Sequence, residues 1–378
     1  MKISTGFDSG NIDCLDCSDP ANVRLAIRKD NQSDFYQWFH FRASGVKDLE
    51  CRFVITNAAG AAYPAGWENY RAVASYDREF WFRVDSRYED GELWIEHMPL
   101  NDSVYYAYFA PYPMERHADL VAAAQESPLA SLEVLGETLD GQDMDLLVVG
   151  EPDAARLPYW VIARQHPGET MAEWWMEGFL GRLLDEDDAV AKALLDEVTF
   201  YVVPNMNPDG SRRGHLRTNA AGANLNREWE NANPETSPEV LYVRERMQQT
   251  GVALSLDVHG DEALPYNFIA GTQGIPGWNE ERDAELNFFR QTYQAINPDF
   301  QTTHGYPANA PGTANLGMCS NYIAHHFACL AMTLEMPFKD TADRPDSLQG
   351  WSPERASRLG ASCLDVLWAY VQQKRRRA

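Results

Sequence analysis

The spacing of apolar residues changes near residue 115, and this change constrains the fold more than any other feature of the chain. Before it, short segments alternate between apolar and polar residues or are rich in aromatic ones, namely 49–55, 78–85, 92–98 and 103–110. Turn sequences such as EDG and PLNDS separate them. Several short strands at this spacing predict an antiparallel β-sandwich or barrel. We expect one face of the first strand to be formed by Leu49, Cys51, Phe53 and Ile55, and one face of the second by Phe80, Phe82 and Val84.

After residue 115 the pattern becomes strand, loop, helix. Apolar runs predict strands at 144–150, 159–163, 198–204, 252–258 and 329–336. Helical spacing appears at 170–184, 237–249, 284–296 and 352–373. In the second of these helices Ser237 is expected to cap the first turn, with Pro238 at the first helical position. Strands that alternate with helices predict an α/β domain with a largely parallel or mixed sheet. The prolines at 111 and 113 divide the chain into domains at 1–114 and 115–378.

Composition excludes several functional classes. The chain has 378 residues, of which 32 are Lys or Arg and 56 are Asp or Glu, for a net charge of −24. Such a charge disfavours partners that are nucleic acids or anionic membranes. No run of 18 apolar residues predicts a membrane span, and the N-terminal residues do not resemble a secretory signal. Six scattered cysteines favour a cytoplasmic protein. The single pair Cys14 and Cys17 has no matching second pair, which favours a structural role over zinc or redox chemistry.

Chemically active side chains follow the predicted strands. His166 and Glu169 come after strand 159–163, His259 follows strand 252–258, and Glu335 lies near the end of strand 329–336. Each alone is compatible with an ordinary turn or a solvated side chain. Ligands of α/β sheets bind beyond the carboxyl ends of the strands, where these residues would meet. Two histidines and one carboxylate form a catalytic zinc set that leaves a position for water, and a further glutamate supplies a general base. An H-E-x-x-H helix is absent, because Thr170 stands where its second histidine would be.

A loop rich in arginine and asparagine follows strand 198–204. It contains Arg217 and then the pair Asn226 and Arg227. These side chains are compatible with a solvated loop, but an arginine fork also suits a planar carboxylate. Zinc, a general base and a carboxylate-binding pair together describe a hydrolase that acts beside a free carboxylate, which is an exopeptidase working at the C-terminus.

Five short motifs carry a resemblance to a known family. They are H-P-G-E at 166–169, N-P-D-G at 207–210, N-L-N-R at 224–227, D-V-H-G at 257–260 and T-L-E-M at 333–336. In this order they resemble the zinc metallocarboxypeptidase family, and the preceding β-rich domain resembles its cytosolic carboxypeptidase branch, including bacterial members. The resemblance implies a mixed, mostly parallel eight-stranded sheet flanked by helices, behind an N-terminal antiparallel β-sandwich. It implies that the substrates are C-terminal tails of peptides or proteins.

The resemblance also implies roles for the matched residues. One zinc ion per chain would be held by His166, Glu169 and His259. Glu335 would act as general base on the zinc-bound water and then pass the proton to the leaving amine. Arg217 would polarise the scissile carbonyl and stabilise the oxyanion. Asn226 and Arg227 would bind the terminal carboxylate of the substrate.

Two departures from the family pattern concern the substrate. Digestive-type members use a tyrosine upstream of the catalytic glutamate, and here Tyr306 and Tyr322 both precede Glu335, so the sequence does not choose between them. Eukaryotic cytosolic members, which trim glutamates from protein tails, often have G-T-A-R near this loop, where this chain has G-T-A-N ending at Asn315. The missing arginine leaves the preference for a terminal glutamate open.

Two other functions remain as alternatives. A zinc-dependent deacylase of N-acyl amino acids would have a similar metal site. A non-catalytic peptide-binding module would use the β domain to recognise a partner. The N-L-N-R motif and the β-rich domain favour the peptidase over the deacylase. The presence of all three ligand residues together with Glu335 argues against a module that has lost its catalysis.

Overall fold

The computed structural model describes residues 1–377, and its first unit consists of two β-sheets. One sheet has the order β1 (Lys2–Ser4), β4 (His40–Ser44), β10 (Ser103–Ala107), β6 (Val73–Ser75) and β7 (Phe82–Arg83). The other has the order β2 (Asp13–Asp16), β3 (Val23–Ala26), β5 (Cys51–Ile55), β9 (Glu92–His97) and β8 (Asp85–Glu89). Three short 3₁₀ helices lie in the loops between these strands, namely η1 (Pro20–Asn22), η2 (Ala58–Gly60) and η3 (Pro64–Trp67).

Aromatic residues fill the space between these two sheets. The ring of Phe41 from β4 packs against Phe53 from β5 and Tyr106 from β10, with ring centroids 5.4 and 5.2 Å away. Strand β5 buries Cys51, Phe53 and Ile55, as its alternation predicts. Leu49 does not follow the prediction and is 39% exposed, because it precedes the first paired residue of β5. Around β7 the predicted face is wrong at two of its three residues: Phe80 is 44% exposed and Phe82 is half-buried, whereas Trp81 and Arg83 are buried and Arg83 contacts the second unit. Alternation therefore identified the inward face of β5 but not that of β7.

A seven-stranded mixed sheet forms the centre of the second unit. Its order is β11 (Ala130–Glu137), β12 (Asp143–Val149), β14 (Val198–Val203), β13 (Leu157–Ala163), β15 (Leu254–Asp261), β17 (Leu330–Pro337) and β16 (Phe268–Ala270). The four strands β14, β13, β15 and β17 run parallel, and the three outer pairings are antiparallel. The expected mixed sheet is confirmed, but the expected count of eight strands is wrong. Beyond the edge strand β16, residues 1–377 form only an isolated parallel bridge between Asn267 and Phe300, which is too short to make an eighth strand.

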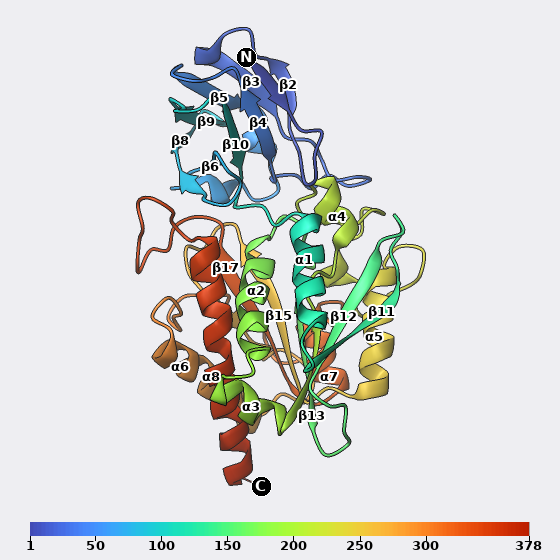
Figure 1. Ribbon diagram of the computed structural model, residues 1–378. Coiled ribbons are helices and arrows are strands. Elements are labelled where there is room, and N and C mark those ends of the chain that lie inside the picture. Colours follow the sequence, from blue (N-terminus) through green and yellow to red (C-terminus); the bar gives the residue numbers. More distant parts are fainter. Residues whose placement is uncertain (378) are drawn as a thin grey trace.

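Helices cover both faces of this sheet (Figure 1). Successive residues of β13 point to opposite sides, so Tyr159 and Val161 belong to one apolar cluster and Trp160 and Ile162 to the other. The first face is covered by α1 (Met114–Gln125), α2 (Met171–Leu183), α3 (Ala189–Leu195), α6 (Glu280–Ile296) and α8 (Pro353–Arg377). The second is covered by α5 (Pro238–Thr250) and α7 (Cys319–His326). Burial on both faces explains why the central strands are almost continuously apolar.

The predicted serine cap of α5 is not made. Ser237 occupies the N-cap position, and Pro238 is the first helical residue as expected. However, the Ser237 hydroxyl accepts a hydrogen bond from the backbone N–H of Asn233, at 3.2 Å, instead of one from the first turn. The side chain therefore stabilises the loop that precedes α5 rather than the helix itself.

The β unit rests on the carboxyl edge of the mixed sheet (Figure 1). Arg83 donates to the carbonyl of Phe338, just after β17, at 2.9 Å. Asn11 donates to the carbonyl of Gly214, at 2.8 Å, in the segment that follows α4 (Pro208–Arg213). We propose to place the domain boundary between residues 114 and 115, beside the start of α1. No helix within residues 1–377 is long and apolar enough to cross a membrane.

Candidate active site

A sharp turn after β13 carries the first two predicted ligands. Arg164 adopts a left-handed backbone conformation, with φ of 57°, and its side chain donates to the carbonyls of Pro167 and Tyr112 at 2.9 and 2.7 Å. Its guanidinium also pairs with Glu173 at the start of α2. A Cβ at position 168 would lie 2.9 Å from the carbonyl oxygen of Leu216, so only glycine allows this close approach. The arginine and the glycine thus fix the turn on which the ligands stand.

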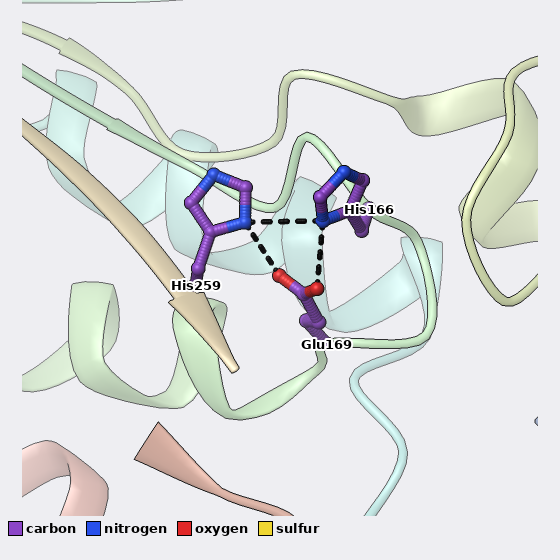
Figure 2. Close-up of side chains that lie close together, drawn as sticks. All are labelled: His166, Glu169 and His259. Atoms are coloured by element: carbon purple, nitrogen blue, oxygen red, sulfur yellow. Dashed lines mark hydrogen bonds and ion pairs between the residues drawn. The ribbon is translucent and has the colours of Figure 1, made fainter. Parts of the chain in front are cut away.

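His166, Glu169 and His259 come together at the carboxyl edge of the sheet (Figure 2). The Nδ1 atoms of both histidines lie 2.7 Å from the two carboxylate oxygens of Glu169, and 3.2 Å from each other. One ligand atom from each residue lies within 4.8 Å of the others, and all three side chains are buried. The structure therefore brings all three predicted ligand residues to one point.

The outer nitrogens of both histidines are bound to acceptors. His166 Nε2 lies 3.0 Å from Oδ1 of Asn224, and His259 Nε2 lies 2.9 Å from Oδ2 of Asp257. An acceptor at Nε2 fixes the proton there and leaves the Nδ1 lone pair facing the centre. Two such lone pairs and one carboxylate are the donor set of a catalytic zinc site. The residues present therefore fit a zinc ion.

The electrostatics of the site also favour a bound cation. Burial lowers the pKa of His166 to about 4, and the charge of Arg217 acts in the same direction. Burial also disfavours a charged His259, but the carboxylates of Asp257 and Glu169 raise the pKa of this histidine well above its ordinary value. The buried carboxylates of Glu169 and Asp257 thus place negative charge beside the two histidines, and a divalent cation at the centre would compensate it.

Glu335 lies directly beside the predicted ligands. In the parallel pairing of β15 with β17 it stands opposite His259, so the two side chains project from neighbouring positions of the sheet. Burial and the carboxylates of Glu169 and Asp261 raise the pKa of Glu335 well above its usual range, against the opposing effect of His259. Its Oε2 atom is buried without a hydrogen-bond partner in residues 1–377. A buried, unpartnered carboxylate oxygen at this point is placed to accept a proton.

Two profiles of known families match the chain, one to each unit. The first, described as the cytosolic carboxypeptidase N-terminal domain, matches residues 3–109. The second, described as zinc carboxypeptidase, matches residues 115–355. The chain belongs to the zinc carboxypeptidase family.

Solved structures and curated relatives agree with this membership. A metallo-carboxypeptidase from Burkholderia cenocepacia is 48% identical, with a TM-score of 0.96 over 98% of this chain and 99% of that one. A metallo-carboxypeptidase from Pseudomonas aeruginosa, in complex with (2-guanidinoethylmercapto)succinic acid, is 46% identical with the same TM-score and the same coverage. Cytosolic carboxypeptidase 3 of Mus musculus is 28% identical over 71% of this chain, which spans 30% of that longer protein.

The remaining predicted residues of this carboxypeptidase lie around the metal centre. Arg217 is half-buried, and its charge is close enough to lower the pKa of His166. Asn226 and Arg227 belong to the short helix η4 (Leu225–Arg227). Asn226 is buried and accepts a hydrogen bond from the backbone N–H of Cys319 at 2.8 Å, whereas Arg227 is exposed and its Nη1 atom donates to the carbonyl of Asn226. All three therefore lie near the predicted ligands or the cavity beside Glu335.

A cavity of about 340 Å³ opens beside Glu335. Its lining is mostly polar and includes Asn226, Gln273, Arg290, Tyr306, Asn309, Ser320, Asn321, Thr333 and Glu335. Tyr306 is 48% exposed and its hydroxyl donates to Asp261. Tyr322 is instead buried and stacks on His326, with ring centroids 3.9 Å apart. Of the two tyrosines that the sequence left open, the structure places Tyr306 in the cavity.

Sequence analysis missed the residues that support the ligands. Gln165 donates to Asp257 at 2.7 Å and accepts from the indole of Trp229 at 2.8 Å. Asp257 and His259 are two apart on β15, so the strand period alone places both on one face and could have revealed the pair. The N-P-D-G motif also has a supporting role, because Asn207 caps α4 through Gly210 and donates to the carbonyl of Gln165, both at 3.0 Å.

Proposed function

We propose that this protein binds one zinc ion through His166, Glu169 and His259 and removes residues from the C-termini of peptides. The observation that carries the proposal is the position of Glu335 between the three-residue metal site and the polar cavity. A substrate whose last residue enters the cavity would place its final peptide bond beside Glu335. Six cysteines that are all free support a reducing compartment such as the cytoplasm.

Glu335 carries the proton transfers of the proposed reaction. Bound zinc supplies a Lewis acid that polarises the scissile carbonyl and lowers the pKa of a water molecule. Glu335 accepts a proton from the attacking water and delivers it to the departing amine, so the C–N bond breaks as a new carboxylate and a free amino acid form. The unpartnered Oε2 atom of this buried side chain supports the role.

Arg217 and the pair Asn226 and Arg227 have distinct proposed roles. Arg217 stabilises the negative charge that develops on the carbonyl oxygen, and its closeness to His166 supports this assignment. Arg227 forms no ion pair within residues 1–377, and apart from the Nη1 bond to the carbonyl of Asn226 its guanidinium has donors left for a terminal carboxylate. The relative from Pseudomonas aeruginosa is bound to a succinic acid derivative, which carries two carboxylates, and this supports carboxylate recognition.

The cavity favours an acidic side chain on the terminal residue. Arg290 from α6 is the only cation among its lining residues, and its Nε and Nη2 atoms donate to the carbonyl of Ile269 at 3.0 and 2.7 Å. These bonds orient the guanidinium, and no carboxylate in residues 1–377 lies within ion-pair distance of it. Burial lowers the pKa of Arg290, so the charge lacks full compensation. We propose that Arg290 binds the carboxylate of a terminal glutamate or aspartate. It would supply the positive charge that is missing at position 315, where this chain has asparagine instead of arginine.

Four peptides that differ only in their last residue test the cavity assignment. With zinc-loaded protein, we expect kcat/KM to be about 10- to 100-fold higher for terminal Glu than for Gln, because only Glu forms an ion pair with the half-buried guanidinium of Arg290. Peptides ending in Leu and Lys should be poorer still. Arg290→Gln should abolish the preference for Glu over Gln without slowing cleavage of the Gln peptide.

Arg246→Gln is the matched control, because it removes the same charge at a surface pair with Glu133 on another part of the chain. The control should keep the preference for terminal Glu. If Arg290→Gln and Arg246→Gln cleave the four peptides in the same order, the acidic preference does not come from Arg290. Release of an internal fragment instead of single residues would contradict the exopeptidase itself.

A further inference from the structure

One carboxylate of the N-terminal unit holds the loop that carries Arg217. Asp30 is only 3% exposed, and its Oδ1 atom accepts a hydrogen bond from the backbone N–H of Leu216 at 2.7 Å. Its Oδ2 atom accepts from the backbone N–H of Arg217 at 2.8 Å and from that of Thr218 at 2.9 Å. The Thr218 hydroxyl adds a fourth bond at 3.1 Å. One side chain thus binds three successive backbone N–H groups across the boundary between the units.

The segment that presents Asp30 is itself fixed to the same loop. The backbone N–H of Asp30 donates to the carbonyl of Phe35 at 2.8 Å and closes a turn. Asn31 donates from its backbone to His215 Nε2 at 3.1 Å and from its side chain to the carbonyl of Ala220 at 2.7 Å. His215 in turn lies 2.8 Å from the carbonyl of Thr218 through Nδ1. Asp30 therefore reaches the loop from a rigid support.

The side chain of Arg217 is held by aromatic rings of the N-terminal unit. Its guanidinium carbon lies 5.6 Å from the ring centre of Phe35 and 5.3 Å from that of Tyr63. Both distances are within the range of a cation–π contact. Asp30 fixes the backbone of Arg217 and the two rings limit its side chain, so the N-terminal unit controls both parts of this residue.

The same loop contacts the turn that carries the metal ligands. Leu216 donates its N–H to Asp30, and its carbonyl accepts from the backbone N–H of Gly168, at 2.9 Å. Gly168 lies between His166 and Glu169. A continuous set of hydrogen bonds therefore leads from Asp30 through the Leu216 backbone to the turn of the metal site.

We propose that Asp30, Phe35 and Tyr63 are positioning residues, through which the N-terminal unit sets the geometry of Arg217 for the hydrolytic step. The inference rests on the proposed function, in which Arg217 stabilises the charge that develops on the scissile carbonyl oxygen. Such a contact strengthens only in the transition state. The N-terminal unit is then a component of the active site and not only a neighbouring fold.

The test uses the full chain and compares the single variants Asp30→Asn, Phe35→Leu and Arg217→Ala. Two double variants combine Arg217→Ala with Asp30→Asn and with Phe35→Leu. We expect Asp30→Asn to lower kcat by about 10- to 100-fold with little change in KM and in zinc content, because small displacements of a catalytic group cost this much. The asparagine keeps one acceptor but turns an NH₂ group toward the backbone donors. Phe35→Leu keeps an apolar contact without the ring face and should lower kcat less.

A double-mutant cycle separates positioning from general stability. If Asp30 acts through Arg217, Asp30→Asn should change kcat by less than about twofold in the Arg217→Ala background. Asp188→Asn is the matched control, since Asp188 also accepts two backbone N–H bonds, at 2.9 and 2.8 Å, at the start of α3. Figure 1 shows α3 at the end of the molecule opposite the N-terminal unit. This control should keep kcat even where it lowers the melting temperature.

Each outcome decides between the proposals. Full turnover by zinc-loaded Arg217→Ala would contradict the proposed function of Arg217. Inactive Arg217→Ala together with fully active Asp30→Asn and Phe35→Leu would contradict only the positioning role. The positioning role would also be contradicted if the fold losses in kcat of Asp30→Asn and Arg217→Ala multiply in the double variant, because the two residues would then act independently. If Asp30→Asn does not fold, the cycle with Phe35→Leu gives the same decision.

Discussion

The carboxylate of Asp257 should determine how tightly the metal site binds zinc. Asp257 is completely buried, and its Oδ2 atom receives hydrogen bonds from Gln165 at 2.7 Å and from His259 Nε2 at 2.9 Å. Asp257→Asn keeps the shape and one acceptor but removes the charge that makes His259 a better ligand. Partners of this kind are typically worth about 10- to 100-fold in metal affinity. Because solvent does not screen the charge of Asp257, we expect a loss at the upper end of this range. The Kd for zinc should rise about 100-fold, which corresponds to about 2.8 kcal/mol of binding free energy.

Substitution of Asn224 by aspartate makes the opposite change, because it adds a negative charge beside His166. Its Oδ1 atom lies 3.0 Å from His166 Nε2, and the side chain is half-buried. Asn224→Asp should therefore tighten zinc binding, by about tenfold or less because water partly screens the new charge. The assay titrates metal-free protein with zinc in competition with a chromophoric chelator, with circular dichroism as the check on folding. A Kd for Asp257→Asn within about threefold of the unmodified protein, or weaker binding by Asn224→Asp, would refute the reasoning.

Three further variants test the ligands, the base and the pH dependence of stability. His259→Ala should lose most of the bound zinc in a metal analysis, and full retention would contradict its role as a ligand. Glu335→Gln should keep zinc and fold but lose about 10²–10⁴-fold in turnover, which kinetics on a peptide substrate would measure. Burial raises the pKa of Glu239 to about 7, so the folded state binds a proton more readily than the unfolded chain. The free energy of unfolding should then fall by about 3 kcal/mol from pH 4.5 to above 7. Glu239→Gln should flatten this dependence in urea titrations, and an unchanged slope would contradict it.

The periodicity of the sequence was sufficient for the elements that bury an apolar face. Helix α2 was expected at 170–184 and is found at Met171–Leu183, and strand β13 contains the expected run 159–163. The edge strands β11 and β16 were missed because neither is continuously apolar. Strand β11 exposes Val134, and β16 has only three residues. An edge strand is stabilised by pairing along one side, which leaves a weaker pattern in its own residues.

The sequence predicted those residues of the site that lie at the ends of strands. The metal ligands and Glu335 all follow or end parallel strands, so topology alone brings them to one edge of the sheet. Asp30 gave no such signal, because it lies 186 to 188 residues before the backbone groups that it binds. A carboxylate in a polar turn predicts a solvated side chain. Only the docking of the two units shows that this carboxylate is buried against the loop of Arg217.

The dependence of cleavage on a free C-terminus tests the central claim most directly. Zinc-loaded protein is incubated with one peptide in two forms, a free acid and a C-terminal amide, and released residues are followed by mass spectrometry. Arg227 is exposed and forms no ion pair within residues 1–377, and a carboxylate offers its guanidinium two coplanar oxygens with a charge. We predict stepwise loss of terminal residues from the free acid and at least about 100-fold slower cleavage of the amide. Equal rates on the two forms would contradict a C-terminal exopeptidase and indicate an endopeptidase or a deacylase instead.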